Sequence, residues 1–128
     1  MPKLLLGFLF AAHGVIHLGY VTPAPADPNY PFSLDKSWLS TNIGLNSSTV
    51  HAFGLLLAII TVAGYALAGL SAAGIIVPQA WWQTLTVIAL VTSLLLLVFF
   101  WHNWLILGVV IDVVLLALMA TNWQPFPA

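Results

Sequence analysis

Four long apolar runs dominate this sequence and decide what it can fold into. They cover about residues 4–20, 50–70, 81–100 and 104–122. A helix that crosses about 30 Å of hydrocarbon needs about 20 apolar residues, because it rises about 1.5 Å per residue. The runs are continuous rather than alternating, which favours helices over the strands of a membrane barrel. We therefore expect an all-α integral membrane protein, with residues 1–128 forming a single domain and an antiparallel four-helix bundle in the lipid bilayer.

The scarcity of charge supports the same class and excludes others. Only 4% of the residues are charged, against about 25% in an average soluble domain. Nucleic-acid binding needs clustered lysines and arginines, and this chain has two basic residues in all. The absence of cysteine excludes disulfides and thiolate metal sites. The five charged residues are Lys3, Asp27, Asp35, Lys36 and Asp112.

Local signals mark where the expected helices begin and end. Side-chain oxygens in the segment 46–49 can cap the second helix, and Pro78 stands just before the third. The turn at residues 101–103 is short, so the third and fourth helices should be antiparallel neighbours. Small residues spaced four apart, at 64 and 68 and at 69 and 73, allow another helix to approach closely. The expected interfacial aromatic belt consists of Trp81, Trp82, Trp101, Trp104 and Trp123.

The connection over residues 21–46, between the first and second helices, is long and rich in proline. Loops longer than about 12–15 residues are often functional lids, although this one could also be a solvated connector. The segment 37–40 is a candidate short helix in the membrane interface.

An even number of crossings places both termini on one side of the membrane. Lys3 favours the cytoplasm for that side, whereas Lys36 in the loop argues the other way. We expect both termini in the cytoplasm. The first run could also be a secretory signal, with its cleavage site at residues 24–26, but we expect a membrane anchor.

The polar residues of the spans are informative when they are ordered by depth. His17, His51 and His102 all approach the membrane face that carries the loop. His13 lies one turn deeper than His17 on the same side of its helix, because residues four apart stack. Asp112 falls near the middle of the fourth span, where a carboxyl group is costly and suggests a function by default. These residues form a polar ladder from the surface to the His13/Asp112 level.

Such a ladder suits three kinds of chemistry. A transition metal could be bound by His13 and His17 with His51 or Asp112, and His102 completes the set of candidate metal ligands. Haem could be held between His17 and His51. A proton relay or a quinone site would use His13, His17, His51 and Asp112, which are the candidate cofactor-binding residues.

Simpler interpretations remain open for each residue. His51 and His102 could be ordinary interfacial histidines, while His13 and His17 could only join helices by hydrogen bonds. Asp112 could be protonated and bridge two helices. The other polar residues in the spans are expected to satisfy themselves or to cross-link helices, and they are Thr61, Tyr65, Gln83, Thr84, Thr86, Thr92 and Ser93.

The first span carries a family resemblance. Residues 8–19 read FLFAAHGVIHLG, and this stretch resembles the first span of small, loosely DoxX-like four-helix bacterial membrane proteins. The resemblance implies a four-helix topology in the bacterial inner (plasma) membrane. It also implies a membrane subunit associated with quinone-linked oxidation.

Three function classes follow from these observations. The first is a small subunit of a membrane redox assembly that holds a metal, haem or quinone at the histidines, next to other membrane subunits. The second is a homo-oligomeric ion or proton channel or carrier that uses Asp112. The third is a structural subunit that packs against a larger membrane or pigment complex.

Overall fold

The computed structural model describes residues 2–126, and in that range it contains helices and no strand. Four helical stretches are long and apolar enough to cross a membrane: Lys3–Tyr20, Ser47–Ala73, Gln79–Phe99 and Asn103–Ala120. Each coincides with one of the expected spans, so the all-α class is confirmed. The elements are α1 (Lys3–Ile16), η1 (His17–Tyr20), α2 (Trp38–Thr41), α3 (Ser47–Ala73), η2 (Gln79–Trp81), α4 (Trp82–Phe99), η3 (Asn103–Leu105) and α5 (Ile106–Ala120).

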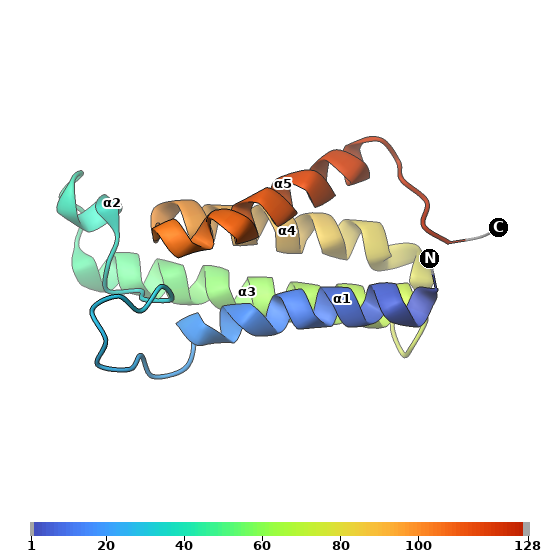
Figure 1. Cartoon of the computed structure of the whole chain (residues 1–128), viewed down its shortest axis with the longest axis horizontal. Helices are drawn as coiled ribbons and strands as arrows, with labels where there is room; N and C mark the ends of the chain where they lie inside the picture. The colour runs from blue at the N-terminus through green and yellow to red at the C-terminus, as the bar shows by residue number, and fades with distance from the viewer. Residues whose placement is uncertain (1, 127–128) are drawn as a thin grey trace.

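The four long helices lie side by side, and successive ones run in opposite directions (Figure 1). α1 packs against α3, α3 against α4, and α4 against α5. α1 begins and α5 ends at the same end of the molecule, whereas the loop and α2 lie at the opposite end. We call the latter end the loop end. This arrangement agrees with an even number of crossings.

The helix ends follow the local sequence. Asn46 caps α3, since its side chain accepts hydrogen bonds from the backbone N–H groups of Ser48 and Thr49. Gly74 ends α3 in the left-handed conformation, at φ 72°, which glycine adopts without strain. Pro78 precedes η2 and α4, as expected.

Glycines bring α1 against the backbone of α3. A Cβ atom on Gly7 would lie 2.7 Å from the carbonyl oxygen of Gly69, so the helices touch at this point. Gly64 makes a similar contact with Ala89 of α4. The small residues of α3 therefore serve packing within this chain.

One tryptophan departs from the expected belt. Trp82 is only 4% exposed and packs against Phe10, Trp123 and Phe126. It lies on the inner side of α4, where an indole ring fills the space between α1 and the segment after α5. Trp81, Trp101 and Trp104 are exposed, in keeping with an interfacial position.

Part of the long loop is a packed element. Ser37 caps the short helix α2, and its hydroxyl donates to the carbonyl oxygen of Phe99 at 2.6 Å. Trp38 Nε1 donates to the carbonyl oxygen of Val98 at the same distance. The last carbonyls of a helix have no partner inside it, so α2 satisfies the end of α4. The expected short helix is confirmed, one residue further along the chain.

Candidate functional site

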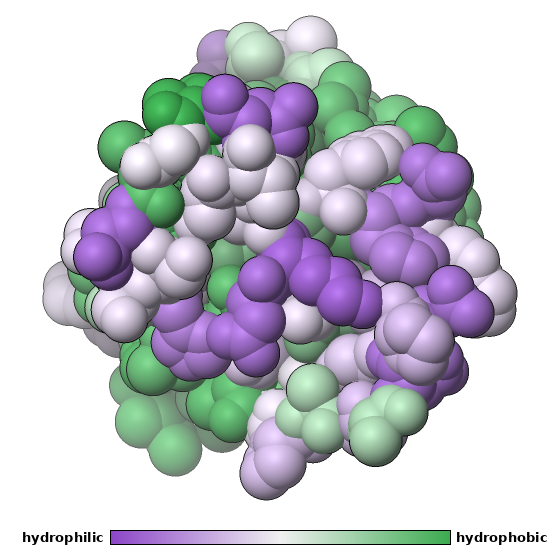
Figure 2. Space-filling view, turned by 90° about the vertical axis from the view of Figure 1, so that its left-hand side faces the viewer, coloured by the Kyte–Doolittle hydropathy of each residue, from purple (hydrophilic) through white to green (hydrophobic). Residues whose placement is uncertain are grey.

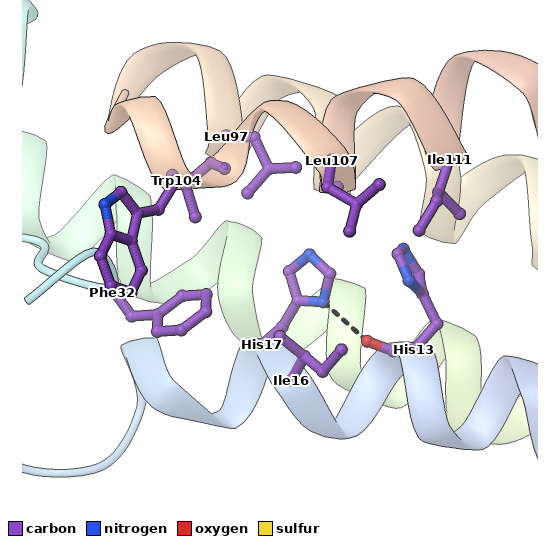
Figure 3. Close-up of a pocket in the computed structure, with 10 residues that line it drawn as sticks. His13, Ile16, His17, Phe32, Leu97, Trp104, Leu107 and Ile111 are labelled. Carbon is purple, nitrogen blue, oxygen red and sulfur yellow. Dashed lines mark hydrogen bonds between the residues drawn. The ribbon is translucent and has the colours of Figure 1, made fainter.

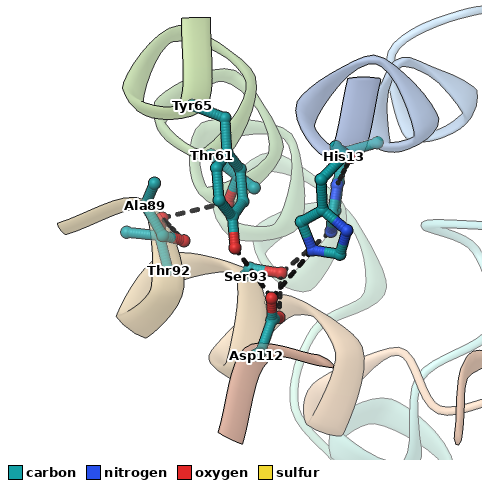
Figure 4. A network of polar contacts seen from close by, with 8 residues as sticks. His13, Thr61, Tyr65, Ala89, Thr92, Ser93 and Asp112 are labelled. Carbon is teal, nitrogen blue, oxygen red and sulfur yellow. Dashed lines mark hydrogen bonds and ion pairs between the residues drawn. The ribbon is translucent and has the colours of Figure 1, made fainter. Parts of the chain in front are cut away.

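Three of the residues singled out in the sequence converge between the helices. His13 and His17 approach Asp112 of α5, and one ligand atom from each lies within 4.8 Å of the others. Asp112 has no exposed surface and His17 is 2% exposed. Figure 4 shows that the network around Asp112 takes side chains from α1, α3, α4 and α5.

The Asp112 side chain has donors on both of its oxygens. Oδ1 lies 2.8 Å from His13 Nε2 and 2.7 Å from the hydroxyl of Tyr65. Oδ2 is in contact with the hydroxyl of Ser93. A buried carboxyl group is tolerated only when such partners replace water. One partner comes from each of the three other long helices, so the packing of the whole chain positions this group.

His17 is held at both ring nitrogens. Nδ1 lies 3.1 Å from the backbone carbonyl oxygen of His13, and Nε2 lies 2.9 Å from Ser93 Oγ. A carbonyl oxygen only accepts, so Nδ1 carries a proton. Ser93 therefore stands between His17 and Asp112, and its single hydroxyl proton can go to only one of them.

This shared serine permits two arrangements of protons. In the first, Ser93 donates to an Asp112 carboxylate, and a doubly protonated His17 donates to Ser93 Oγ. In the second, a protonated Asp112 donates to Ser93 Oγ, and Ser93 donates to a neutral His17. Both arrangements contain the same number of protons and differ by a shift of two protons along the chain Asp112–Ser93–His17. The cluster can thus move charge without moving a side chain.

The histidines reach this position because α1 lies very close to α3 at Gly14. A Cβ atom on Gly14 would lie 2.6 Å from the Cβ atom of Tyr65. The ring of Tyr65 then packs edge-on against His13, with centroids 4.9 Å apart, and stacks on His17 at 6.0 Å. The glycine between the two histidines is therefore part of the construction of the site.

An apolar cavity opens beside the two histidines. It has a volume of about 160 Å³ and lies between α1 and α5, which do not pack closely on each other (Figure 3). His13 Nδ1 has no hydrogen-bond partner among residues 2–126 and is not fully buried. Other residues that line it are Ile16, Phe32, Leu97, Leu107 and Ile111. We call this space the inner cavity.

The cluster contains a donor set that suits a metal ion. Two histidines and one carboxylate are typical ligands of non-haem iron and of zinc. Ligand atoms around a tetrahedral ion at about 2.0–2.1 Å stand roughly 3.4 Å apart. The separation of 2.8 Å between His13 Nε2 and Asp112 Oδ1 is that of a hydrogen bond. A metal would fit these residues after a small opening of the cluster.

His51 and His102 lie outside this cluster. His51 Nδ1 pairs with Asp35 Oδ1 of the loop at 2.9 Å, and both side chains are exposed. His102 Nδ1 accepts a hydrogen bond from the backbone N–H of Trp104 and so caps η3. The structure does not bring His51 to His17 as a pair of haem ligands.

Tyr65 and Ser93 belong to the site, although the sequence indicated only general polar roles for them. Ser93 lies about as far before the turn at residues 101–103 as Asp112 lies after it, so depth was a usable signal. Counting residues from the helix ends could not reveal that Tyr65 lies level with Asp112, because α3 extends beyond the end of α4 at the loop end. Gly54, and not Ser47, meets Phe100 at the end of α4.

Comparisons with known proteins add no further constraint on this site. No family model, no curated protein and no solved structure matches this chain, and the candidate site is therefore defined by its residues alone.

Proposed function

We propose that this chain is a small integral membrane subunit of a redox assembly and that it binds a quinone at the inner cavity. The four long helices would form an antiparallel bundle in a bacterial plasma membrane, with the termini in the cytoplasm and the loop on the outer side. The membrane-spanning lengths of the helices and the apolar surface of α5 support this placement.

The observation that carries the proposal is an apolar, ring-sized cavity with a free histidine nitrogen. An apolar cavity of about 150 Å³ holds a benzene ring, and the inner cavity has about 160 Å³. It lies between α1 and α5, so an isoprenoid tail could leave it toward lipid. A quinone headgroup matches both its size and its few polar contacts.

His13 would exchange a proton with the headgroup. Its Nε2–H donates to Asp112, which leaves Nδ1 as an acceptor in the neutral ring. Oxidation of a hydroquinone releases two protons and two electrons. His13 Nδ1 accepts the proton of one hydroquinone hydroxyl. It accepts the proton of the other hydroxyl after it has released the first proton. The electrons pass to a partner subunit that holds its own redox centre.

The test is direct binding of a short-chain hydroquinone to the purified protein in lipid nanodiscs. The double variant His13→Ala/His17→Ala should bind at least about tenfold more weakly, because a hydrogen bond to a group that becomes charged contributes about 1.5–3 kcal/mol. His102→Ala is the matched control, since His102 lies outside the cluster, and it should bind as the unmodified chain does. Unchanged binding in the double variant would refute the proposal.

A metal centre is the second candidate, because three metal-ligating side chains lie within 4.8 Å of one another. Elemental analysis of protein purified without chelators distinguishes the two. A metal close to one per chain that disappears in His13→Ala/His17→Ala would favour this candidate. The geometry gives less support to a channel through an oligomer, since Asp112 is enclosed within one chain.

A further inference from the structure

A second cavity lies under the long loop, and the quinone proposal does not use it. Its volume is about 310 Å³, and it is lined by Tyr20, Thr22, Ser33, Asp35 and His51, among others. Figure 2 views the molecule from the loop end, and hydrophilic side chains gather across this face. We call this second cavity the vestibule. Its lining is partly polar, and its place at the loop end suits water.

The vestibule and the inner cavity share one wall, the ring of Phe32. Phe32 lines both cavities, and in Figure 3 it stands at the loop end of the inner cavity, near His17. The ring also lies on the backbone at Gly19, where a Cβ atom would be only 2.8 Å from it. Tyr30 fixes this part of the loop, because its hydroxyl donates to the carbonyl oxygen of Gly19 at 3.2 Å.

Protonatable groups lie on both sides of this wall. On the vestibule side, His51 Nδ1 is bonded to Asp35, which leaves the other ring nitrogen free. Tyr20 packs edge-on against Phe32, with centroids 5.3 Å apart. Its hydroxyl is the one fully buried side-chain polar atom among residues 2–126 that has no hydrogen-bond partner. On the inner side, His17 begins the chain to Ser93 and Asp112.

The opposite direction is closed. Between the Asp112 network and the end where α1 begins, the helices pack through a continuous apolar cluster that includes Phe10, Ala68, Trp82 and Leu90. Water reaching the network from that end would have to cross this cluster. Apolar residues such as Tyr20, Leu34 and Leu97 pack at the loop end as well, but they line the two cavities that meet at Phe32. The loop end is therefore the shorter route between the network and an aqueous phase.

We propose that the vestibule is the site at which the His13/His17/Asp112 network exchanges protons with water, and that Phe32 is the barrier between them. The inference rests on the proposed role of the network in proton exchange, but not on the identity of the ligand in the inner cavity. A proton would pass from water in the vestibule, past the edge of Phe32, to the His17–Ser93–Asp112 chain, or in the reverse direction. His51 and Asp35 would accept and release it at the outer end.

Substituted-cysteine labelling tests the barrier, because the chain has no cysteine of its own. Leu97 lines the inner cavity and is buried, so Leu97→Cys reports access to that space. The probe is a permanently charged methanethiosulfonate, which does not enter through lipid, and labelling is measured by intact-protein mass spectrometry. We expect slow labelling in the presence of Phe32 and labelling at least about tenfold faster with Phe32→Ala, since removal of the ring joins the two cavities.

Three controls make the result decisive. Phe32→Leu keeps most of the apolar bulk and should keep the cysteine protected. Phe53→Ala removes a phenylalanine that lines neither cavity and should have no effect. Ser33→Cys in the vestibule should label rapidly with or without Phe32. Equal labelling of Leu97→Cys with Phe32 and with Phe32→Ala, while Ser33→Cys labels, would overturn the proposal.

A second measurement uses water itself as the probe and leaves Leu97 intact. Deuterium exchange at the Cε1–H of His17, followed by mass spectrometry, should be faster in Phe32→Ala and unchanged in Phe53→Ala. If Phe32→Ala does not fold, Phe32→Val provides the smaller change. A rate of deuterium exchange at His17 that is the same in Phe32→Ala as in the unmodified chain would contradict the barrier. Neither measurement requires a quinone, so loss of the quinone proposal would be seen separately, in the binding assay.

Discussion

At the scale of single residues, the site depends on how Asp112 is satisfied. Replacement by asparagine provides an informative change, because its amide can reproduce one of the two proton arrangements. The amide oxygen can accept from His13 and Tyr65, while its N–H can donate to Ser93, which then donates to His17. We expect Asp112→Asn to fold with a stability within about 1 kcal/mol of the unmodified chain. It should lower quinone-linked turnover of the assembly by about 100-fold or more, since the proton shift is blocked.

Asp112→Ala is the matched comparison. It leaves the Tyr65 hydroxyl and the His13 Nε2–H without an acceptor, whereas Ser93 can still donate to His17, and each group that stays unsatisfied costs about 1–3 kcal/mol. Thermal unfolding in detergent should therefore rank Asp112→Ala far below Asp112→Asn. Equal destabilisation of the two variants would mean that only the carboxylate form supports the fold, and the two-arrangement scheme would fail.

Two buried tyrosines permit a second test at this scale. The Tyr65 hydroxyl donates to Asp112, whereas the Tyr20 hydroxyl has no partner among the described residues. Tyr65→Phe should lower the free energy of unfolding by about 1–3 kcal/mol, and Tyr20→Phe should be close to neutral. Chemical denaturation in mixed micelles measures both. A larger loss in Tyr20→Phe than in Tyr65→Phe would contradict the hydrogen-bond assignment.

The sequence identified part of this site for physical reasons that can be stated. His13 and His17 are one turn apart, and Asp112 is a carboxyl group in an apolar run, so each was conspicuous by position. Depth alone also placed His51 near them. Depth does not say which way a side chain points around its helix, and His51 is bonded to Asp35 at the surface. Ser93 did not stand out in the sequence, because the hydroxyl of a serine in a helix commonly donates a hydrogen bond to a backbone carbonyl of the same helix.

At the scale of elements, the contact between α1 and α3 sets the position of both histidines. Gly14→Ala would place a methyl group 2.6 Å from Tyr65 Cβ, which is attached directly to the backbone and cannot move aside alone. We expect a loss of about 1–3 kcal/mol in the free energy of unfolding, as for other overpacked sites. Thermal unfolding in detergent would measure it, and quinone binding should weaken together with it.

Gly108→Ala is the control for this change. Its Cβ would meet only the terminal Cδ1 of Leu97, at 3.2 Å, and a flexible side chain can yield. The gain in helix propensity of about 1 kcal/mol then offsets most of the contact. If Gly108→Ala destabilised the chain as much as Gly14→Ala, the close approach of α1 and α3 would not be the controlling feature.

The elements themselves were largely predictable, while their neighbours were not. Continuous hydrophobicity marks a membrane-length helix, and Asn46 and Pro78 mark helix starts by known local chemistry. The short turn after Phe99 predicted that α4 and α5 are adjacent, and they are. Nothing in the runs indicated that α1 would pack on α3 and leave a gap beside α5, because that choice depends on side-chain fit around each helix axis.

At the scale of the whole molecule, α5 is the least covered of the long helices. Only 17% of its span is buried within the chain, and large apolar side chains such as Leu107, Val110 and Val114 face outward. The proposed bilayer can cover such a face without cost, and so can a redox partner subunit. The inner cavity opens along this same helix, which places a bound headgroup close to any partner that packs there.

The placement of the chain in the membrane yields the last prediction. Single cysteines can be introduced into the cysteine-free chain at three exposed positions: Asn29 in the loop, Ala80 between α3 and α4, and Gln124 after α5. Four crossings put Asn29 on one side and both other positions on the opposite side. With the termini in the cytoplasm, a membrane-impermeant thiol reagent applied to intact cells should label Asn29→Cys alone. Ala80→Cys and Gln124→Cys should react only after the cells are permeabilised.

The reverse pattern would invert the orientation but keep four crossings, and would move the vestibule to the cytoplasmic face. Labelling of Asn29→Cys and Gln124→Cys from the same side would contradict the crossings themselves, because an odd number of spans separates the loop from each end of the chain, one from the first residues and three from Gln124.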